Sequence, residues 1–191
     1  QLAAAAQMIV FRENGMPVPF GELWRTRRTV VIFIRHFWCP SCQDYLISVM
    51  RDVDHAKLQR SGIQLVVVGC GPFNLIKSYR HIFRLPYQVF VDPSANQQLY
   101  STLGMGTLLP SPARKSGGRE GGEYARHGPV GGHVMVWKNA LRTGMPIWAK
   151  GGDPAQLGGE FVLGPGIHCA YVHRMRHTRG HAPILDVLSA A

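Results

Sequence analysis

The chain has 191 residues, which is enough for one domain with a buried core and short for two. Hydrophobic residues make up 46% of it and charged residues 17%, a composition typical of folded proteins and not of disordered ones. The net charge of +10 comes from cations scattered along the chain without a nucleic-acid-binding module, so we expect no nucleic-acid partner. No apolar run approaches the roughly 20 residues that cross a bilayer, so we also expect no membrane span.

The first third of the chain predicts strands. Residues 8–11 and 16–20 form two short apolar runs, joined by Asn14-Gly15, a pair that favours a tight turn because both residues tolerate positive φ. Residues 29–35 are apolar and β-branched without polar alternation. Such a run is typical of a central strand buried on both faces, which favours a parallel or mixed sheet covered by helices.

The middle of the chain alternates between helix and strand periodicity. Apolar residues at helical spacing predict one helix over residues 40–60, ended by Gly62, and a second helix over residues 75–83, ended by Pro86. Strands are predicted at residues 63–68 and 87–91, followed by a short helix at residues 94–103. The resulting β–α–β–α–β order indicates an α/β fold.

The last third begins with a stretch of different composition. Residues 110–132 are rich in Gly, Pro, Ser and Arg, and we predict a loop there. Helical spacing follows around residues 134–141, then a loop at residues 151–159. Residues 161–163 and 169–173 predict a hairpin across Gly164-Pro165-Gly166, and residues 182–188 predict a closing helix.

Two of the four cysteines form the motif Cys39-Pro40-Ser41-Cys42, placed between a buried strand and an amphipathic helix. Free N–H groups and the helix dipole at such a point stabilise a thiolate, which is the form that attacks a disulfide or a peroxide. Pro40 suits the first helical turn, where a missing N–H costs nothing. We therefore interpret Cys39 as a nucleophile and Cys42 as the thiol that resolves its oxidised form.

A C-x-x-C motif alone also occurs in zinc sites, and the cysteines could be inert. Zinc normally takes a second pair of ligands, whereas Cys70 and Cys169 stand alone in apolar runs and are interpreted as buried small hydrophobes. Arginines are interspersed among four late histidines and would repel a cation, so we expect no bound metal there either. These histidines are His168, His173, His177 and His181. The placement of the motif in an α/β chain favours redox chemistry.

Four segments resemble the peroxiredoxin-like AhpC/TSA antioxidant proteins, a group similar to prostamide/prostaglandin F synthase. They are residues 33–45, 66–71, 89–93 and 158–166. The resemblance implies an α/β thioredoxin-like fold in which helices flank a central mixed sheet. It implies a single domain over residues 1–191, with an insertion at about residues 104–157 before the C-terminal β-hairpin. By the same resemblance, Cys39 matches the reactive cysteine and Cys42 the second cysteine of the motif.

The chain departs from true peroxiredoxins at positions that orient a peroxide. His36 stands where those proteins carry a Thr, and Gly158-Gly159-Glu160 stand where they use an Arg. These departures argue against fast, general peroxide removal. Arg35 and His36 are the substitutes we consider, because a nearby cation lowers a thiol pKa and a histidine can donate a proton. Strand geometry would let only one of the two face Cys39, and both could instead cap the strand end.

The function we expect is that of a thiol-dependent oxidoreductase that reduces a small-molecule peroxide, an endoperoxide or a disulfide. No flavin or nicotinamide motif is visible, so we expect no bound cofactor and an external dithiol reductant of the thioredoxin or glutathione type. Two alternatives stay open: a redox-regulated binding protein without turnover, and a specialised enzyme for a lipid endoperoxide or a secondary metabolite.

The compartment and the assembly follow less directly from the sequence. The cysteine pattern suits a reducing compartment, and residues 1–6 lack the basic start of a signal peptide, so we expect a cytoplasmic protein. Gln1 leaves room for an organellar leader that has already been removed. A homodimer is compatible with the sequence.

Overall fold

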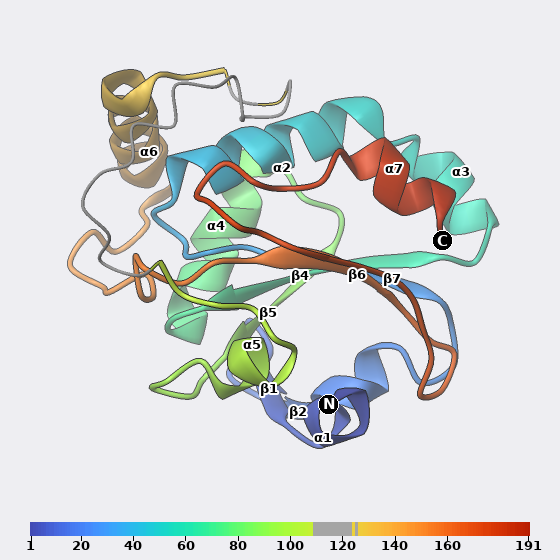
Figure 1. Cartoon of the computed structure of the whole chain (residues 1–191). Coiled ribbons are helices and arrows are strands. Elements are labelled where there is room, and N and C mark those ends of the chain that lie inside the picture. Colours follow the sequence, from blue (N-terminus) through green and yellow to red (C-terminus); the bar gives the residue numbers. More distant parts are fainter. Residues whose placement is uncertain (109–123, 125) are drawn as a thin grey trace.

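The computed structural model describes residues 1–108, 124 and 126–191, and Figure 1 shows a central sheet with helices on both faces. The strands are β1 (Ile9–Phe11), β2 (Pro17–Pro19), β3 (Thr29–Phe33), β4 (Gln64–Cys70), β5 (Gln88–Asp92), β6 (Gly159–Leu163) and β7 (Cys169–Arg174). The helices are α1 (Leu2–Ala6), α2 (Pro40–Asp52), α3 (His55–Arg60), α4 (Ile76–Phe83), α5 (Gln98–Thr102), α6 (Pro129–Thr143) and α7 (Ile184–Ser189). No described helix has both the length and the apolar character needed to cross a membrane.

The seven strands form one mixed sheet in the order β2-β1-β5-β4-β3-β6-β7. The central strands β3, β4 and β5 run parallel, whereas β6 pairs antiparallel with β3 and β7 antiparallel with β6. Every residue of β3 is buried, and all but the first, Thr29, are apolar, as expected for a central strand covered on both faces. The predicted α/β fold with a mixed sheet and a C-terminal hairpin is confirmed.

Alternate residues of the central strands supply two separate cores. Val30 and Ile32 point into the larger core, which holds side chains of α2, α4 and α7. Val31 and Phe33 point into the other, which holds side chains of α1 and α5. These helices therefore cover opposite faces of the sheet, as Figure 1 shows.

Phe33 lies at the centre of an aromatic cluster in the second core. Its ring centroid lies 5.0 Å from that of Tyr100, 5.5 Å from that of Phe161 and 5.9 Å from that of Phe20. Edge-to-face contacts of this kind add to the stabilisation that burial of the rings provides. The cluster anchors the last residue of β3, after which the chain turns toward the cysteine motif.

Two predicted helices have different bounds in the structure. The single helix expected over residues 40–60 is two helices, because Val53 is extended and the side chain of Asp54 accepts the N–H of Lys57 as a new N-cap. The helix expected around residues 134–141 starts earlier, at Pro129, so the loop expected at residues 110–132 ends sooner. The part of that loop at residues 110–123 and 125 lies outside the described residues.

The expectation that Cys169 is buried is wrong. Cys169 opens β7, which is the strand at the edge of the sheet, and its side chain is exposed. An edge strand has a neighbour on one side only, so an apolar run does not guarantee burial there. Cys70 lies on the central strand β4 and is buried as expected.

We predict that Phe33→Ala lowers the free energy of unfolding by about 3–5 kcal/mol, because it removes the ring around which the second core packs. Urea denaturation followed by circular dichroism measures the change. Met16→Ala is the control: its side chain is exposed, and we expect a change within about 0.5 kcal/mol. Equal midpoints for the two variants would contradict the assignment of Phe33 to the centre of this core.

Candidate active site

Cys39 lies where the chain enters α2. It is the N-cap residue of that helix, with φ −78° and ψ 113°, and its Sγ accepts the N–H of Cys42 at 3.4 Å. Pro40 occupies the first helical turn, where it leaves no N–H without a partner. A sulfur in this position faces the positive end of the helix dipole, which favours its anionic form.

The guanidinium of Arg35 contacts the same sulfur. Its Nη1 donates to Cys39 Sγ at 3.4 Å, and its Nε donates to the carbonyl of Gln156 at 3.0 Å. The third nitrogen, Nη2, donates to the carbonyl of Pro154. Only 6% of Arg35 is exposed, so these contacts hold a cation inside the protein next to the thiol.

Residues 149–154 pack tightly against the chain around the motif. The N–H of Phe37 donates to the carbonyl of Gly151 at 2.9 Å, and the indole of Trp38 donates to the carbonyl of Ala149 at 3.1 Å. Gly152 has a φ of +114°, and a Cβ there would lie 2.5 Å from Cys70 Sγ, so only glycine fits. This close approach keeps the carbonyls that bind Arg35 in place.

The charges around Cys39 decide its ionisation. Burial alone would raise the pKa of Cys39, but a hydrogen bond from the Cys42 thiol and the positive charge of Arg35 outweigh it and hold the pKa well below its ordinary value. Ser41 Oγ lies 3.2 Å from Cys39 Sγ. The geometry therefore favours the thiolate of Cys39 more than the surroundings of an ordinary cysteine do.

The expectation that only one of Arg35 and His36 faces Cys39 rested on strand geometry, whereas β3 ends at Phe33 and the alternation of strand side chains ends with it. Arg35 contacts Cys39 Sγ directly. Burial lowers the pKa of His36, which favours its neutral form. Both side chains are buried, so neither faces solvent at the strand end.

Cys42 has the opposite character. It is fully buried, and its Sγ accepts the backbone N–H of Arg35 at 3.4 Å. Burial raises the pKa of Cys42 well above its ordinary value, and the hydrogen bond to Cys39 and the charge there raise it further. Both cysteines are free thiols in the structure. The motif thus pairs one easily ionised sulfur with one that keeps its proton.

Sequence reasoning missed two polar residues beside Cys42. His181 Nε2 lies 3.3 Å from Cys42 Sγ, and its Nδ1 lies 2.5 Å from Glu160 Oε1. In the sequence Glu160 stood out only as a departure from the peroxiredoxin pattern, and His181 only as one of four late histidines. A carboxylate inside the apolar strand β6 was the signal that could have found the pair.

The remaining late histidines do not gather around His181 as a metal centre. Within the described residues no group of three or more His, Cys, Asp and Glu side chains is placed to hold a metal ion. Cys70 is also set apart from the chemistry: its thiol donates to the carbonyl of Arg35 at 2.9 Å, and burial raises its pKa to about 12. Cys70 therefore behaves as a structural thiol.

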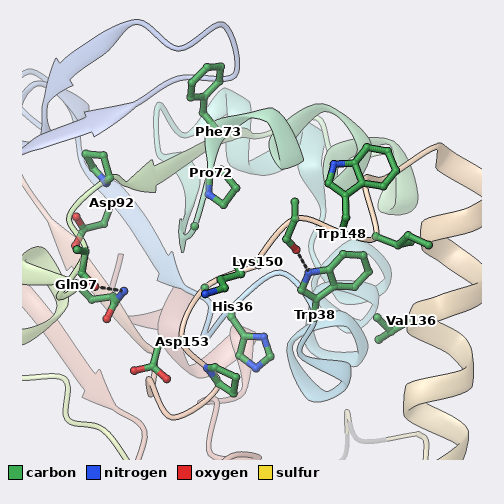
Figure 2. Close-up of a pocket in the computed structure, with 18 of the residues that line it drawn as sticks. His36, Trp38, Pro72, Phe73, Asp92, Gln97, Val136, Trp148, Lys150 and Asp153 are labelled. Carbon is green, nitrogen blue, oxygen red and sulfur yellow. Dashed lines mark hydrogen bonds between the residues drawn. The ribbon is translucent and has the colours of Figure 1, made fainter.

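An open pocket of about 1270 Å³ lies beside the motif, and His36 and Trp38 form part of its wall. Figure 2 shows Trp38 and Trp148 on one side and Asp92 and Asp153 on the other. The pocket is apolar near the tryptophans and polar near the carboxylates. Its contact with His36 connects it to the residues that act on Cys39.

A thioredoxin-like sheet with a dithiol at the N-terminus of α2 defines a thioredoxin-fold protein of the peroxiredoxin-like class. The family model described as AhpC/TSA antioxidant enzyme matches residues 52–177, and human peroxiredoxin-like 2C is 32% identical over 188 residues, 97% of this chain and 78% of that protein. The chain therefore belongs to the AhpC/TSA antioxidant enzyme family, which confirms the resemblance seen in the sequence. The residues that the family model matches begin at residue 52, so they do not include Cys39 or Cys42.

One further curated protein and two solved structures are also similar to this chain. The Arabidopsis thaliana thioredoxin-like protein AAED1, chloroplastic, is 26% identical over 93% of this chain and 67% of its own length. Among solved structures, peroxidoxin BcpB from Mycobacterium tuberculosis matches with a TM-score of 0.61 at 13% identity, over 96% of this chain and 90% of that one. A peroxiredoxin-like protein from Aquifex aeolicus gives a TM-score of 0.53 at 13% identity, covering 96% and 81%. These structures share the fold.

We predict that Arg35→Met moves the pH midpoint for alkylation of Cys39 upward by about one pH unit, because it removes the cation in contact with the sulfur. Iodoacetamide labelling across a pH series, read by peptide mass spectrometry, measures the midpoint. Arg25→Met, which removes an exposed arginine paired with Glu22, is the matched control and leaves the midpoint unchanged. Identical midpoints in the two variants would show that Arg35 does not stabilise the thiolate.

Proposed function

We propose that the protein is a dithiol oxidoreductase in which Cys39 attacks a hydroperoxide or a small disulfide and Cys42 completes the oxidation. The observation that carries the proposal is the difference between the two sulfurs. Cys39 has a lowered pKa and a guanidinium in contact, whereas Cys42 has a raised pKa and lies next to it. A nucleophile and a resolving thiol need these two opposite properties.

With a hydroperoxide, the Cys39 thiolate attacks the terminal oxygen and the O–O bond breaks. The alkoxide leaves and takes up a proton, and Cys39 becomes a sulfenic acid. The sulfur of Cys42 then attacks Cys39, the proton of Cys42 and the hydroxyl group leave as water, and a disulfide forms. With a disulfide substrate the intermediate is a mixed disulfide, and a thiol leaves in place of water.

An external dithiol returns the protein to its reduced form. One thiolate of the donor attacks Cys39, Cys42 leaves as a thiol after protonation, and the second donor thiol releases Cys39. The donor is thereby oxidised to a disulfide, and the two electrons it loses restore the two thiols. Donors of the thioredoxin or glutathione type have this chemistry, and we propose that one of them serves this protein.

Burial of the motif limits what can react. Cys39 and Cys42 are both fully buried, Ser41 Oγ donates to the carbonyl of Thr178 at 2.6 Å, and Arg35 binds the carbonyls of Pro154 and Gln156. A folded protein, whether a disulfide substrate or a thioredoxin-type donor, reaches the Cys39 sulfur only when these segments separate. This arrangement favours a slender oxidant, such as the end of a hydroperoxide, as the substrate.

The pocket beside the motif supports a narrower function with the same chemistry, in which the substrate is an apolar peroxide. Its tryptophan-rich wall suits the apolar part of an organic hydroperoxide or endoperoxide. His36 belongs both to this wall and to the groups that act on Cys39. A specialised enzyme for apolar peroxides is therefore the second function that we propose to test.

We predict that Cys39→Ser abolishes the peroxidase turnover supported by a thioredoxin-type reductant, whereas Cys42→Ser permits one oxidation and leaves a sulfenic acid on Cys39. Turnover is followed through consumption of reductant, and the sulfenic acid is trapped with dimedone and located by mass spectrometry. Hydrogen peroxide and an apolar hydroperoxide are compared at equal concentration. Cys70→Ser is the control, because Cys70 is a structural thiol, and it keeps turnover.

Faster turnover of the apolar hydroperoxide, lost on Trp148→Ala, would support the second candidate, since that side chain is 85% exposed in the pocket wall and its removal leaves the core intact. If neither peroxide nor glutathione disulfide oxidises the dithiol, the proposed function is wrong. The redox-regulated binding protein considered from the sequence would then account better for the motif.

A further inference from the structure

Behind Cys42 lies a pair of polar side chains that the proposed reaction leaves unused. Glu160 on β6 and His181, just before α7, are both fully buried at the side chain and in contact with each other. A carboxylate enclosed in a protein core is costly unless charged or hydrogen-bonding partners surround it. Because burial of this pair is costly and His181 lies against Cys42, the question is what the pair does to the Cys42 sulfur.

The hydrogen bonds around Glu160 fix the protonation of the His181 ring. Glu160 Oε2 accepts the N–H of Ala182 at 3.1 Å, while Oε1 faces His181 Nδ1. Because a carboxylate accepts and does not donate, Nδ1 carries the proton of the imidazole. In the neutral imidazole the other nitrogen, Nε2, is then the one with a free lone pair, and it lies 3.3 Å from Cys42 Sγ.

Two tyrosines hold the His181 ring in this orientation. The ring of Tyr45 stacks on it at 4.2 Å with an interplanar angle of 1°, and the hydroxyl of Tyr124 accepts the backbone N–H of His181 at 3.1 Å. The titratable groups that face the pair are Cys42 and Tyr45 from α2, Tyr124, and His173 and Tyr171 from β7. His173 Nε2 lies 4.0 Å from Glu160 but bonds to the carbonyl of Gly180 at 2.7 Å.

Cys42 needs such a base. To attack the oxidised Cys39 it must lose its proton, yet it is fully buried and shows no contact with solvent. Burial and the neighbouring Cys39 raise the pKa of Cys42, so few molecules would hold a Cys42 thiolate without help. An imidazole whose lone pair faces the thiol is positioned to accept that proton.

We propose that His181 is the general base for Cys42 and that Glu160 is the residue that positions it. The inference rests on the proposed function, because it assigns the proton of its second step. As Cys42 attacks Cys39, the S–H proton passes to His181 Nε2, the S–S bond forms, and a thiolate or hydroxide leaves Cys39 and takes up a proton from solvent. In the reductive direction the imidazolium returns the proton to Cys42 as Cys42 leaves.

The experiment separates the two steps with methyl methanethiosulfonate, a small thiol reagent. The Cys39 thiolate attacks its S–S bond, methanesulfinate leaves, and Cys39 carries a methyl mixed disulfide. Cys42 then attacks the Cys39 sulfur, and methanethiol leaves. Rapid mixing, acid quenching and intact-mass analysis in a Cys169→Ser background, which removes the exposed thiol, follow both species with time.

We predict that His181→Gln leaves formation of the mixed disulfide unchanged and slows its resolution about 100-fold. In the variant the rate at which Cys42 resolves the mixed disulfide rises with hydroxide concentration over the whole pH range in which the protein is folded, because Cys42 must then lose its proton to solvent. In the wild type this rate levels off once the imidazole is neutral. Glu160→Gln, which keeps the shape and removes the charge, slows the same step by a smaller factor and changes its pH profile.

His127→Gln is the matched control. It breaks a second imidazole–carboxylate contact, between His127 Nδ1 and Asp44 at 2.7 Å, that touches neither cysteine, and we expect both steps to keep the wild-type rates. Circular dichroism confirms folding, and Glu160→Gln carries the test if His181→Gln does not fold. The role of His181 would be overturned if His181→Gln slowed formation and resolution of the mixed disulfide equally. It would also be overturned if the variant resolved the mixed disulfide with the wild-type rate and pH profile. Failure of the wild type to form any mixed disulfide would instead refute the proposed function.

Discussion

The contact between the Arg35 guanidinium and the sulfur of Cys39 is the interaction on which the proposed chemistry of this protein depends. A thiolate enclosed in a protein is unstable unless a cation and hydrogen-bond donors are already in position. Here the cation is fixed by two backbone carbonyls, those of Pro154 and Gln156, and the donor is the N–H of Cys42. The loop before β6 is therefore as necessary to the site as the helix that carries the cysteines.

The sheet explains how the second sulfur obtains a different environment. β6 pairs antiparallel with β3 so that Glu160 lies opposite Ile32, and Ile32 belongs to the core beneath α2. Residues opposite each other in a sheet point to the same face, so the carboxylate of Glu160 enters the space under α2 where Cys42 lies. The segment before α7 then brings His181 between them. One helix turn thus carries one sulfur that faces a cation and another that faces an imidazole.

The sequence predicts the parts of this site that are close together along the chain. The apolar run of β3 and the motif at the start of α2 are local signals, and so is the nearness of Arg35 to Cys39. The His181–Cys42 contact joins residues 139 positions apart, and no periodicity or spacing reports such a contact. The same limit applies to Cys169, whose exposure depends on β7 being an edge strand, and to Arg35 and His36, whose placement depends on β3 ending at Phe33.

The stabilisation of the Cys39 thiolate has a consequence for the direction of electron flow. Every interaction that favours the anion, from Arg35 to the helix N-terminus, acts on the reduced protein and is lost when the sulfur enters a disulfide. In the oxidised protein Arg35 would also be a buried cation without its anionic neighbour. In the proposed cycle these contacts favour the dithiol over the disulfide and so shift the reduction potential of the Cys39–Cys42 couple to more positive values.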